Sequence, residues 1–228
     1  MHLLAEIPQA RIGLRWDREL SGEAEPRIRQ LRGALGNAFR EDALFHQHDP
    51  ATGRPLFRYP RVQYRWHAGQ GLVVGWAEAV QRLLDLPWLD LRLRLGDEPV
   101  QVTDATVRAG TGTFGVAQRL LRYRFDTPVL LFNQENYRRY RQLGAPAQRR
   151  ECERLLTASL LMMLRGLGVT FPERLYVTFI AHRQRTCHYK GERLLGLVGE
   201  FATNAVLPDG VACGHAVSHG YGCLVASE

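Results

Sequence analysis

Hydrophobic patterning in the first half of the chain restricts the fold more strongly than any other feature of this sequence. Residues 3–15 alternate between apolar and polar side chains, which is typical of a half-buried strand. Apolar residues then recur at helical spacing over 28–39, and Pro26 suits the first turn of that helix. The apolar runs 62–66 and 72–76 flank a glycine-containing turn and predict a β-hairpin.

One more helix and two more strands complete the pattern. Residues 77–86 fit a short helix that Pro87 ends, and strand-like segments come next at 89–95 and 99–108. The resulting order, β-α-β-β-α-β, is that of the ferredoxin-like or RRM-like domain. The sequence therefore predicts an α+β fold whose first domain, residues 1–112, is ferredoxin-like.

The second half repeats this order with a modification. A strand over 120–132 is followed by a short helix with an asparagine cap and by a longer helix over 146–167. Strands are predicted at 175–181 and 193–203, but no second helix is evident before the glycine-rich C-terminus. We therefore expect two tandem ferredoxin-like βαββαβ domains, the second being a modified copy over residues 113–228.

The expected boundary between the domains, residues 109–115, contains a deceptive glycine motif. Gly110, Gly112 and Gly115 spell G-x-G-x-x-G after a strand, as in dinucleotide-binding proteins. That function needs a helix directly after the glycines, whereas residues 119–132 alternate as a strand does. We interpret the glycines as a flexible linker, and an NAD-dependent enzyme is the weakest of the alternatives.

Composition and the N-terminal residues predict where the protein acts. Hydrophobic residues make up 45% of the 228 positions, which is enough for a core in each domain. No run reaches the roughly 18 apolar residues that span a membrane, and Glu6 comes too early for a secretory signal peptide. We therefore expect a cytoplasmic protein with no membrane association.

The positive charge of the chain is almost entirely arginine. The formal net charge is +7, and Lys190 is the only lysine. The planar guanidinium binds pairs of phosphate oxygens, so arginines interleaved with aromatic residues over 54–65 fit a nucleic-acid surface. A solvated strand face would show the same pattern. The candidate contacts to nucleic acid are Arg54, Arg58, Arg61, Arg65 and Lys190.

His46 and His48 are the clearest candidates for chemistry. They come after the first predicted helix, directly before the basic tract, and an irregular backbone there would bring both imidazoles toward one point. RNA transesterification needs a base for the 2′-hydroxyl proton and an acid for the leaving 5′ oxygen, and histidine can serve as either near neutral pH. Neighbouring arginines could stabilise the phosphorane without a metal ion.

Two other interpretations of this pair stay open. The histidines could be polar surface residues at a helix end, or they could form half of a metal site with Asp49. Elsewhere, Cys187 lies between His182 and His188, but two imidazoles and one thiol do not complete a tetrahedral site. We therefore expect neither a metal ion nor an organic cofactor.

A glycine-rich segment near the C-terminus is the second functional candidate. Gly214 is followed after five residues by Gly220-Tyr221-Gly222. Glycine permits positive φ and a close approach to a backbone or a phosphate, although many such segments are only tight turns. Gly214, Gly220 and Gly222 are therefore candidate RNA-binding positions.

Together these residues resemble the repeat-cleaving CRISPR endoribonucleases of the RAMP superfamily, in particular a subgroup with paired N-terminal histidines. The resemblance spans nearly the whole chain. One departure is Ala212, which stands where the family has the first glycine of its loop. The resemblance rests on Leu31-Arg32-Gly33-Ala34-Leu35-Gly36, Phe45-His46-Gln47-His48-Asp49, Thr52-Gly53-Arg54, Arg58-Tyr59-Pro60-Arg61-Val62-Gln63-Tyr64 and the C-terminal glycine segment.

The resemblance implies a reaction and a set of partners. Precursor crRNA would be cut within its repeats, while repeat RNA lies across the basic surfaces of both domains. His46 or His48 would be the general acid–base group, the products would be a 2′,3′-cyclic phosphate and a 5′-hydroxyl, and Tyr59 is our candidate for an assisting hydroxyl. Subunits of a CRISPR effector complex and a second copy of the chain are further candidate partners. The alternative is a non-catalytic RAMP subunit that only holds crRNA, but such a subunit should lack the paired histidines.

Overall fold

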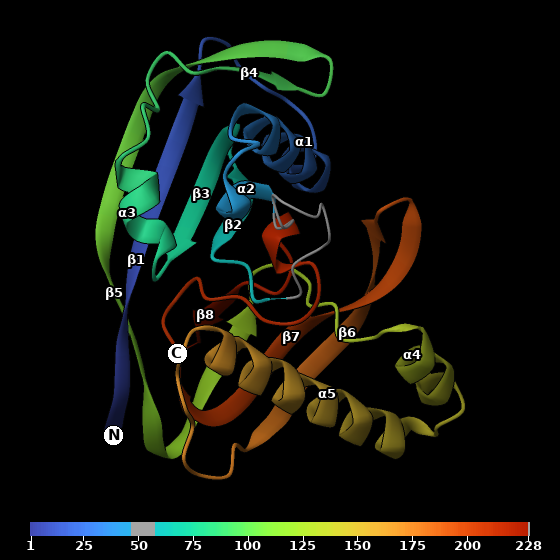
Figure 1. Cartoon of the computed structure of the whole chain (residues 1–228). Coiled ribbons are helices and arrows are strands. Elements are labelled where there is room, and N and C mark those ends of the chain that lie inside the picture. The colour runs from blue at the N-terminus through green and yellow to red at the C-terminus, as the bar shows by residue number, and fades with distance from the viewer. Residues whose placement is uncertain (47–57, 228) are drawn as a thin grey trace. The chain divides into compact units, whose positions relative to one another are not determined.

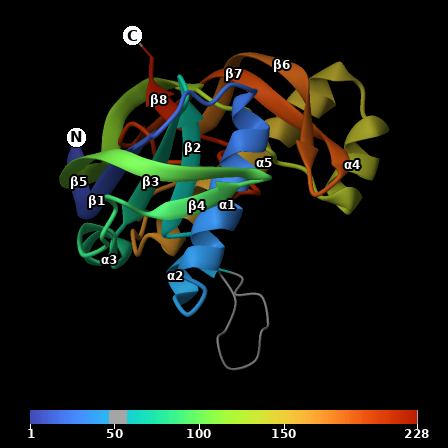
Figure 2. The same ribbon diagram turned by 90° about the horizontal axis from the view of Figure 1, so that it is seen from above.

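The computed structural model describes residues 1–46 and 58–227, and its elements are shown from two directions in Figure 1 and Figure 2. The chain forms two compact units. We call Ile7–Thr111 with Ser218–Gly220 the N-terminal unit, and Gly112–Val217 with Met1–Glu6 and Tyr221–Glu228 the C-terminal unit. The domain boundary between residues 112 and 113 stays a prediction.

The N-terminal unit has the strand order of a ferredoxin-like domain. Its strands are connected by α1 (Ala24–Ala38), α2 (Ala43–His46) and α3 (Ala79–Leu84). The sheet order is β2 (Val62–His67), β3 (Gln70–Trp76), β1 (His2–Trp16) and β5 (Glu98–Phe125), with β4 (Arg92–Leu95) paired to β5. Strand β3 pairs antiparallel with both β1 and β2, which confirms the predicted hairpin.

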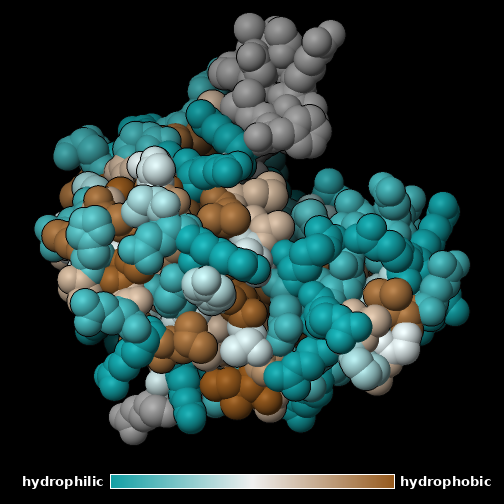
Figure 3. Space-filling view, turned by 90° about the horizontal axis from the view of Figure 1, so that it is seen from below, coloured by the Kyte–Doolittle hydropathy of each residue, from teal (hydrophilic) through white to brown (hydrophobic). Residues whose placement is uncertain are grey.

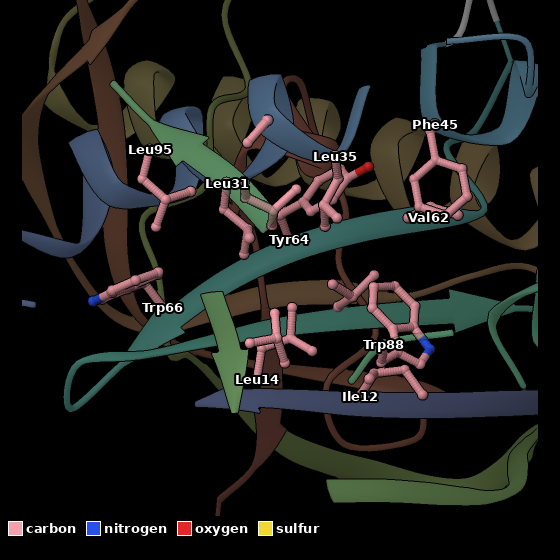
Figure 4. Packing of buried hydrophobic residues seen from close by; sticks show 14 of the residues in the cluster. Ile12, Leu14, Leu31, Leu35, Phe45, Val62, Tyr64, Trp66, Trp88 and Leu95 are labelled. Carbon is pink, nitrogen blue, oxygen red and sulfur yellow. The ribbon is translucent and has the colours of Figure 1, made fainter. Parts of the chain in front are cut away.

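Alternating side chains explain why this sheet has one buried face. On β1, Ile12 and Leu14 are fully buried, and the residues between them face the other side of the sheet. Helix α1 covers the buried face with Leu31 and Leu35, because apolar residues three and four apart share one side of a helix. Figure 4 shows these helix residues packed over Tyr64 and the strands below it.

Two tight turns of the same kind connect the main hairpins. Ala68 and Gly69 between β2 and β3 have φ values of 47° and 77°. Lys190 and Gly191, which lie between β6 (Val177–Tyr189) and β7 (Glu192–Val206), have φ values of 51° and 82°. Two consecutive residues with positive φ match the twist of antiparallel strands, so each turn sets the register of its hairpin.

The C-terminal unit repeats the order with one helix replaced. Its sheet order is β8 (Leu224–Ala226), β5, β7 and β6. Helices α4 (Gln134–Arg141) and α5 (Ala145–Gly166) come after β5 in the chain. After β7, where a second helix is expected, the chain has the glycine segment with the 3₁₀ turn η1 (Val217–His219), and Ser218–Gly220 of this stretch count with the N-terminal unit. The predicted tandem ferredoxin-like fold with a modified second copy is therefore confirmed.

Local interactions explain where α4 begins and how it is held to α5. The Asn133 side chain accepts a hydrogen bond from the Asn136 amide at 2.8 Å, which confirms the predicted asparagine cap of α4. Glu151 on α5 binds Arg154 on the same helix and Arg139 on α4. These two guanidinium groups lower the pKa of Glu151 to about 2, and Arg154 has the larger effect.

The prediction of a flexible linker at 109–115 is wrong. Gly110 and Gly112 lie inside β5, a continuous strand of 28 residues. Gly115 pairs with Val206 of β7, and a Cβ at Gly115 would lie 2.7 Å from the carbonyl oxygen of His2. Glycine lowers strand propensity, but pairing with neighbouring strands keeps this segment extended. At Gly115 the backbone contact is so close that only a residue without a side chain fits there.

The surface carries scattered apolar groups. On the face drawn in Figure 3, small hydrophobic patches are separated by hydrophilic side chains. Within residues 1–46 and 58–227, no helix is both long enough and apolar enough to cross a membrane.

Candidate active site and nucleic-acid interface

Helix α2 places the first candidate histidine. Asp42 accepts a hydrogen bond from the Leu44 amide at 3.0 Å, and its second carboxylate oxygen accepts one from Arg82 Nε at 2.7 Å. Phe45 is 2% exposed, and its ring centroid lies 4.9 Å from that of Phe39 in the core. His46 ends α2 directly after Phe45, so its backbone is held by a buried neighbour.

The rest of the histidine motif lies outside the described residues. His48, Asp49 and Arg54 belong to residues 47–57, and the side chain of His46 is likewise not described. The approach of His46 to His48 therefore stays a prediction.

Tyr59 is held by a buried amide. Its hydroxyl oxygen accepts a hydrogen bond from Gln63 Nε2 at 3.0 Å, and the same nitrogen donates to the Pro60 carbonyl at 3.2 Å. Gln63 is only 1% exposed, so its position is set by the core of the N-terminal unit. The hydroxyl oxygen of Tyr59 therefore acts as an acceptor in this contact, and the buried amide fixes where it lies.

The basic tract divides between surface and interior. Arg58 is exposed, but Arg61 donates from Nε to Glu78 at 3.0 Å and its side chain is 17% exposed. The two-residue period of β2 directs Tyr64 into the core and half-buried Arg65 to the opposite face. Burial raises the pKa of Tyr64 far above its usual range, so this hydroxyl stays neutral and its ring offers no stacking surface to a nucleic acid.

The glycine segment lies close against the backbone of its own chain. A Cβ on Gly214, whose φ is +91°, would lie 2.7 Å from the Leu130 carbonyl oxygen. A Cβ on Gly222, whose φ is +72°, would collide with the Cys213 carbonyl oxygen. In the N-terminal unit, a Cβ on Gly220 would lie 3.1 Å from the Tyr64 carbonyl oxygen. These contacts explain the glycines, while a role in RNA binding stays a prediction.

The hairpin of β6 and β7 carries cations that the sequence analysis largely missed. Lys190 is exposed at the turn, with its ammonium nitrogen 5.5 Å from the centroid of the Tyr189 ring. Strand β6 is an edge strand of the sheet. Three more cations on this hairpin are exposed. The sequence did contain a signal for this surface: arginine alternates with another residue over 183–185, a pattern that predicts an exposed strand face. The three further cations are Arg183, Arg185 and Arg193.

Metal ligands do not gather in the part of the chain that the structure describes. Within those residues, no three histidine, cysteine or carboxylate side chains lie close enough together to hold a metal ion. The four cysteines all lie in described residues, are buried, and form no disulfide bond.

Comparison with known proteins matches both halves of the chain to one family. The model of the Cas6b N-terminal domain matches residues 6–111, and that of the Cas6b C-terminal domain matches residues 115–227. An uncharacterized protein of Methanocaldococcus jannaschii is 29% identical over 136 residues, which are 60% of this chain and 92% of that protein.

Solved structures share the fold. A crystal structure of Cas6b has a TM-score of 0.86 at 22% identity, over 98% of this chain and 100% of that one. A crystal structure of the CRISPR RNA processing endoribonuclease Cas6b has a TM-score of 0.73 at 21% identity, over 97% and 100%. A Cas6 product complex has a TM-score of 0.51 at 18% identity, again over 97% and 100%.

Proposed function

The chain belongs to the Cas6b family, and we propose that it is a metal-independent endoribonuclease that cleaves the repeats of precursor crRNA. The observation that carries this proposal is the match of both family domains, which together cover residues 6–111 and 115–227. A protein of the same fold is named a CRISPR RNA processing endoribonuclease, which supports the choice of substrate.

The proposed reaction uses the RNA as its own nucleophile. One imidazole, His46 or His48, takes the proton from the 2′-hydroxyl beside the scissile phosphate, and the 2′ oxygen forms a bond to phosphorus. The bond from phosphorus to the 5′ oxygen breaks, and the other imidazole protonates that oxygen. The products are a 2′,3′-cyclic phosphate and a 5′-hydroxyl, and no redox or metal step is needed for this balance.

Assisting groups stabilise the phosphorane and hold the RNA. Tyr59 assists through its hydroxyl group, which the buried amide of Gln63 holds in place. Exposed Arg58 neutralises developing negative charge, and Arg54 does the same from within residues 47–57. Arg65, Lys190 and the glycine segment contribute to the RNA surface. Arg61 contributes least, because Glu78 already neutralises it.

The remaining partners and the place of action belong to the same proposal. The protein cleaves precursor crRNA in the cytoplasm, and the processed crRNA then passes to subunits of a CRISPR effector complex. A second copy of the chain is a further partner, which sedimentation with and without repeat RNA would reveal.

A single atom in the substrate tests the mechanism. Replacing the 2′-hydroxyl beside the scissile phosphate by hydrogen should abolish cleavage, because the nucleophile is gone. Binding should weaken by no more than about 0.5–1.5 kcal/mol, the net value of one hydrogen bond. The same replacement one nucleotide away is the control and should be cleaved normally.

Two outcomes would contradict this mechanism. Cleavage of the RNA that lacks the nucleophile would require an attacking water. Complete loss of activity in excess chelator would assign His46, His48 and Asp49 to a metal site, because a metal ion would then position that water.

A further inference from the structure

The C-terminal unit contains a pocket that the proposed cleavage chemistry does not use. Its volume is about 490 Å³. The walls come from the start of α4 and the segment before it, from the β6–β7 hairpin, and from the glycine segment. Among the residues that line it are Leu130, Asn133, Gln134, Tyr137, Tyr189 and His215.

The floor and walls of this pocket are largely apolar or aromatic. Leu130 is 1% exposed and belongs to a small core with Cys187 and Tyr221, against which Tyr189 also packs. Tyr137 on α4 is 39% exposed. Ligand pockets are lined mainly by apolar and aromatic side chains, and a flat ring fits such a lining by stacking.

Polar groups stand at the edge of the pocket. Asn133 uses its amide oxygen to cap α4, so its NH₂ group remains a donor. Partial burial lowers the pKa of His215, which keeps its imidazole neutral and able to accept a hydrogen bond at neutral pH. The edge of a nucleobase offers such donors and acceptors around an apolar face.

One cation, Arg193, lines the pocket, and the segments that form its walls carry others. Residues 133–141 and 189–195 contain Arg138, Arg139, Arg141, Lys190 and Arg193 against two acids, Glu135 and Glu192. Arg139 is paired with Glu151. The guanidinium of Arg141 lies 6.0 Å from the centroid of the Tyr137 ring. At this distance the guanidinium can bind a phosphate while the ring stacks on the base of the same nucleotide. This excess of positive charge favours a nucleotide over an uncharged apolar ligand.

We propose that this pocket holds one unpaired nucleobase of the bound repeat RNA. The base lies against Tyr137 and Tyr189, its edge meets Asn133 and His215, and the cations of the wall segments hold its phosphates. This inference rests on the proposed function, since it names a recognition site for the same RNA. The pocket is thus a specificity site within the C-terminal unit.

The test removes bases from the RNA one at a time. Repeat RNAs with a single abasic nucleotide at each unpaired position are bound to the wild-type chain, and their affinities are measured. Base–aromatic stacking predicts a loss of about 5- to 150-fold at one position and little at the others. A photoreactive uridine at that position should crosslink to Tyr137 or Tyr189, as mass spectrometry of the peptide would show.

A matched pair of variants assigns the effect to the pocket. Tyr137→Ala should weaken binding of intact RNA by about the same 5- to 150-fold and lose all sensitivity to the abasic position. Tyr176→Ala is the control, because Tyr176 is also exposed and lies 5.3 Å from a guanidinium, Arg174, but does not line this pocket. Thermal melting confirms that both variants are folded.

The outcomes separate this inference from the proposed function. Wild-type protein that neither binds nor cleaves repeat RNA would overturn the function itself. Three outcomes would overturn the base pocket alone, each with cleavage by the wild-type protein intact. They are equal affinities for all the abasic RNAs, no crosslink to either tyrosine, and equal losses of RNA affinity in Tyr137→Ala and Tyr176→Ala.

Discussion

The two units share one strand order, but two of their basic regions differ in what the cations contact. In the N-terminal unit, Arg61 is bound to Glu78 and Arg82 to Asp42, so these guanidinium groups hold structure together. In the C-terminal unit, Lys190 and Arg193 stand exposed on a hairpin at the end of the sheet order. A basic stretch therefore indicates a nucleic-acid surface only where no carboxylate from another element meets it.

The units also differ in the segment that comes after their third strand. In the N-terminal unit this segment is α3, after β3, whereas in the C-terminal unit it is the glycine segment, after β7. A helix satisfies its own backbone groups, but an irregular segment must bond to its surroundings. His215 N donates to the Leu130 carbonyl at 2.8 Å and Cys213 N to the Gly222 carbonyl at 3.0 Å. The glycine segment is therefore held by backbone bonds to other parts of the chain.

The largest effect is expected on the rate of cleavage when either candidate catalytic histidine is replaced. His46→Ala and His48→Ala should each slow cleavage by about 10²–10⁴-fold, the usual contribution of a general acid or base, with nearly unchanged RNA affinity. Single-turnover rates at saturating protein would measure this. His67→Ala is the control, because His67 is an exposed histidine of the same unit at the end of β2. Wild-type rates in both single variants would remove the catalytic assignment.

A smaller effect should appear in the stability of the C-terminal unit. Gly214→Val should lower the free energy of unfolding by on the order of 3 kcal/mol, because positive φ and the contact with the Leu130 carbonyl both exclude a β-branched side chain. Gly110→Val is the control, since a Cβ there meets nothing within 4 Å. Urea unfolding compares the two variants, and equal stability would show that the glycine segment tolerates side chains.

The smallest effect should appear in the salt dependence of binding. Lys190→Ala should reduce the slope of log affinity against log salt by about one, because one phosphate contact is lost. Arg165→Ala, which removes an exposed cation at the end of α5, should leave the slope unchanged. Titrations of labelled repeat RNA at several salt concentrations would measure both slopes. The same decrease in both variants would indicate that the charge acts over the whole surface and that the hairpin has no special role.

Much of the fold could be predicted from patterns that neighbouring residues carry. The alternation over 3–15, the helical spacing over 28–39 and the hairpin around Gly69 predicted elements that the structure contains, because these periods depend on local geometry. The prediction of a linker at 109–115 was wrong because the structure there depends on distant residues. Two glycines in a strand lower its local preference, and only pairing with distant residues such as Val206 makes that strand continuous.

The candidate site divides in the same way. The sequence by itself determined which residue types could cut RNA, namely His46, His48 and Tyr59, because their chemistry is a property of the side chains. Only the tertiary structure decided that Arg61 is neutralised, that Gln63 holds Tyr59, and that Tyr137 and Tyr189 line one pocket. Those facts depend on contacts between residues far apart in the chain, and Tyr137 and Tyr189 show no pattern in sequence that would place them together.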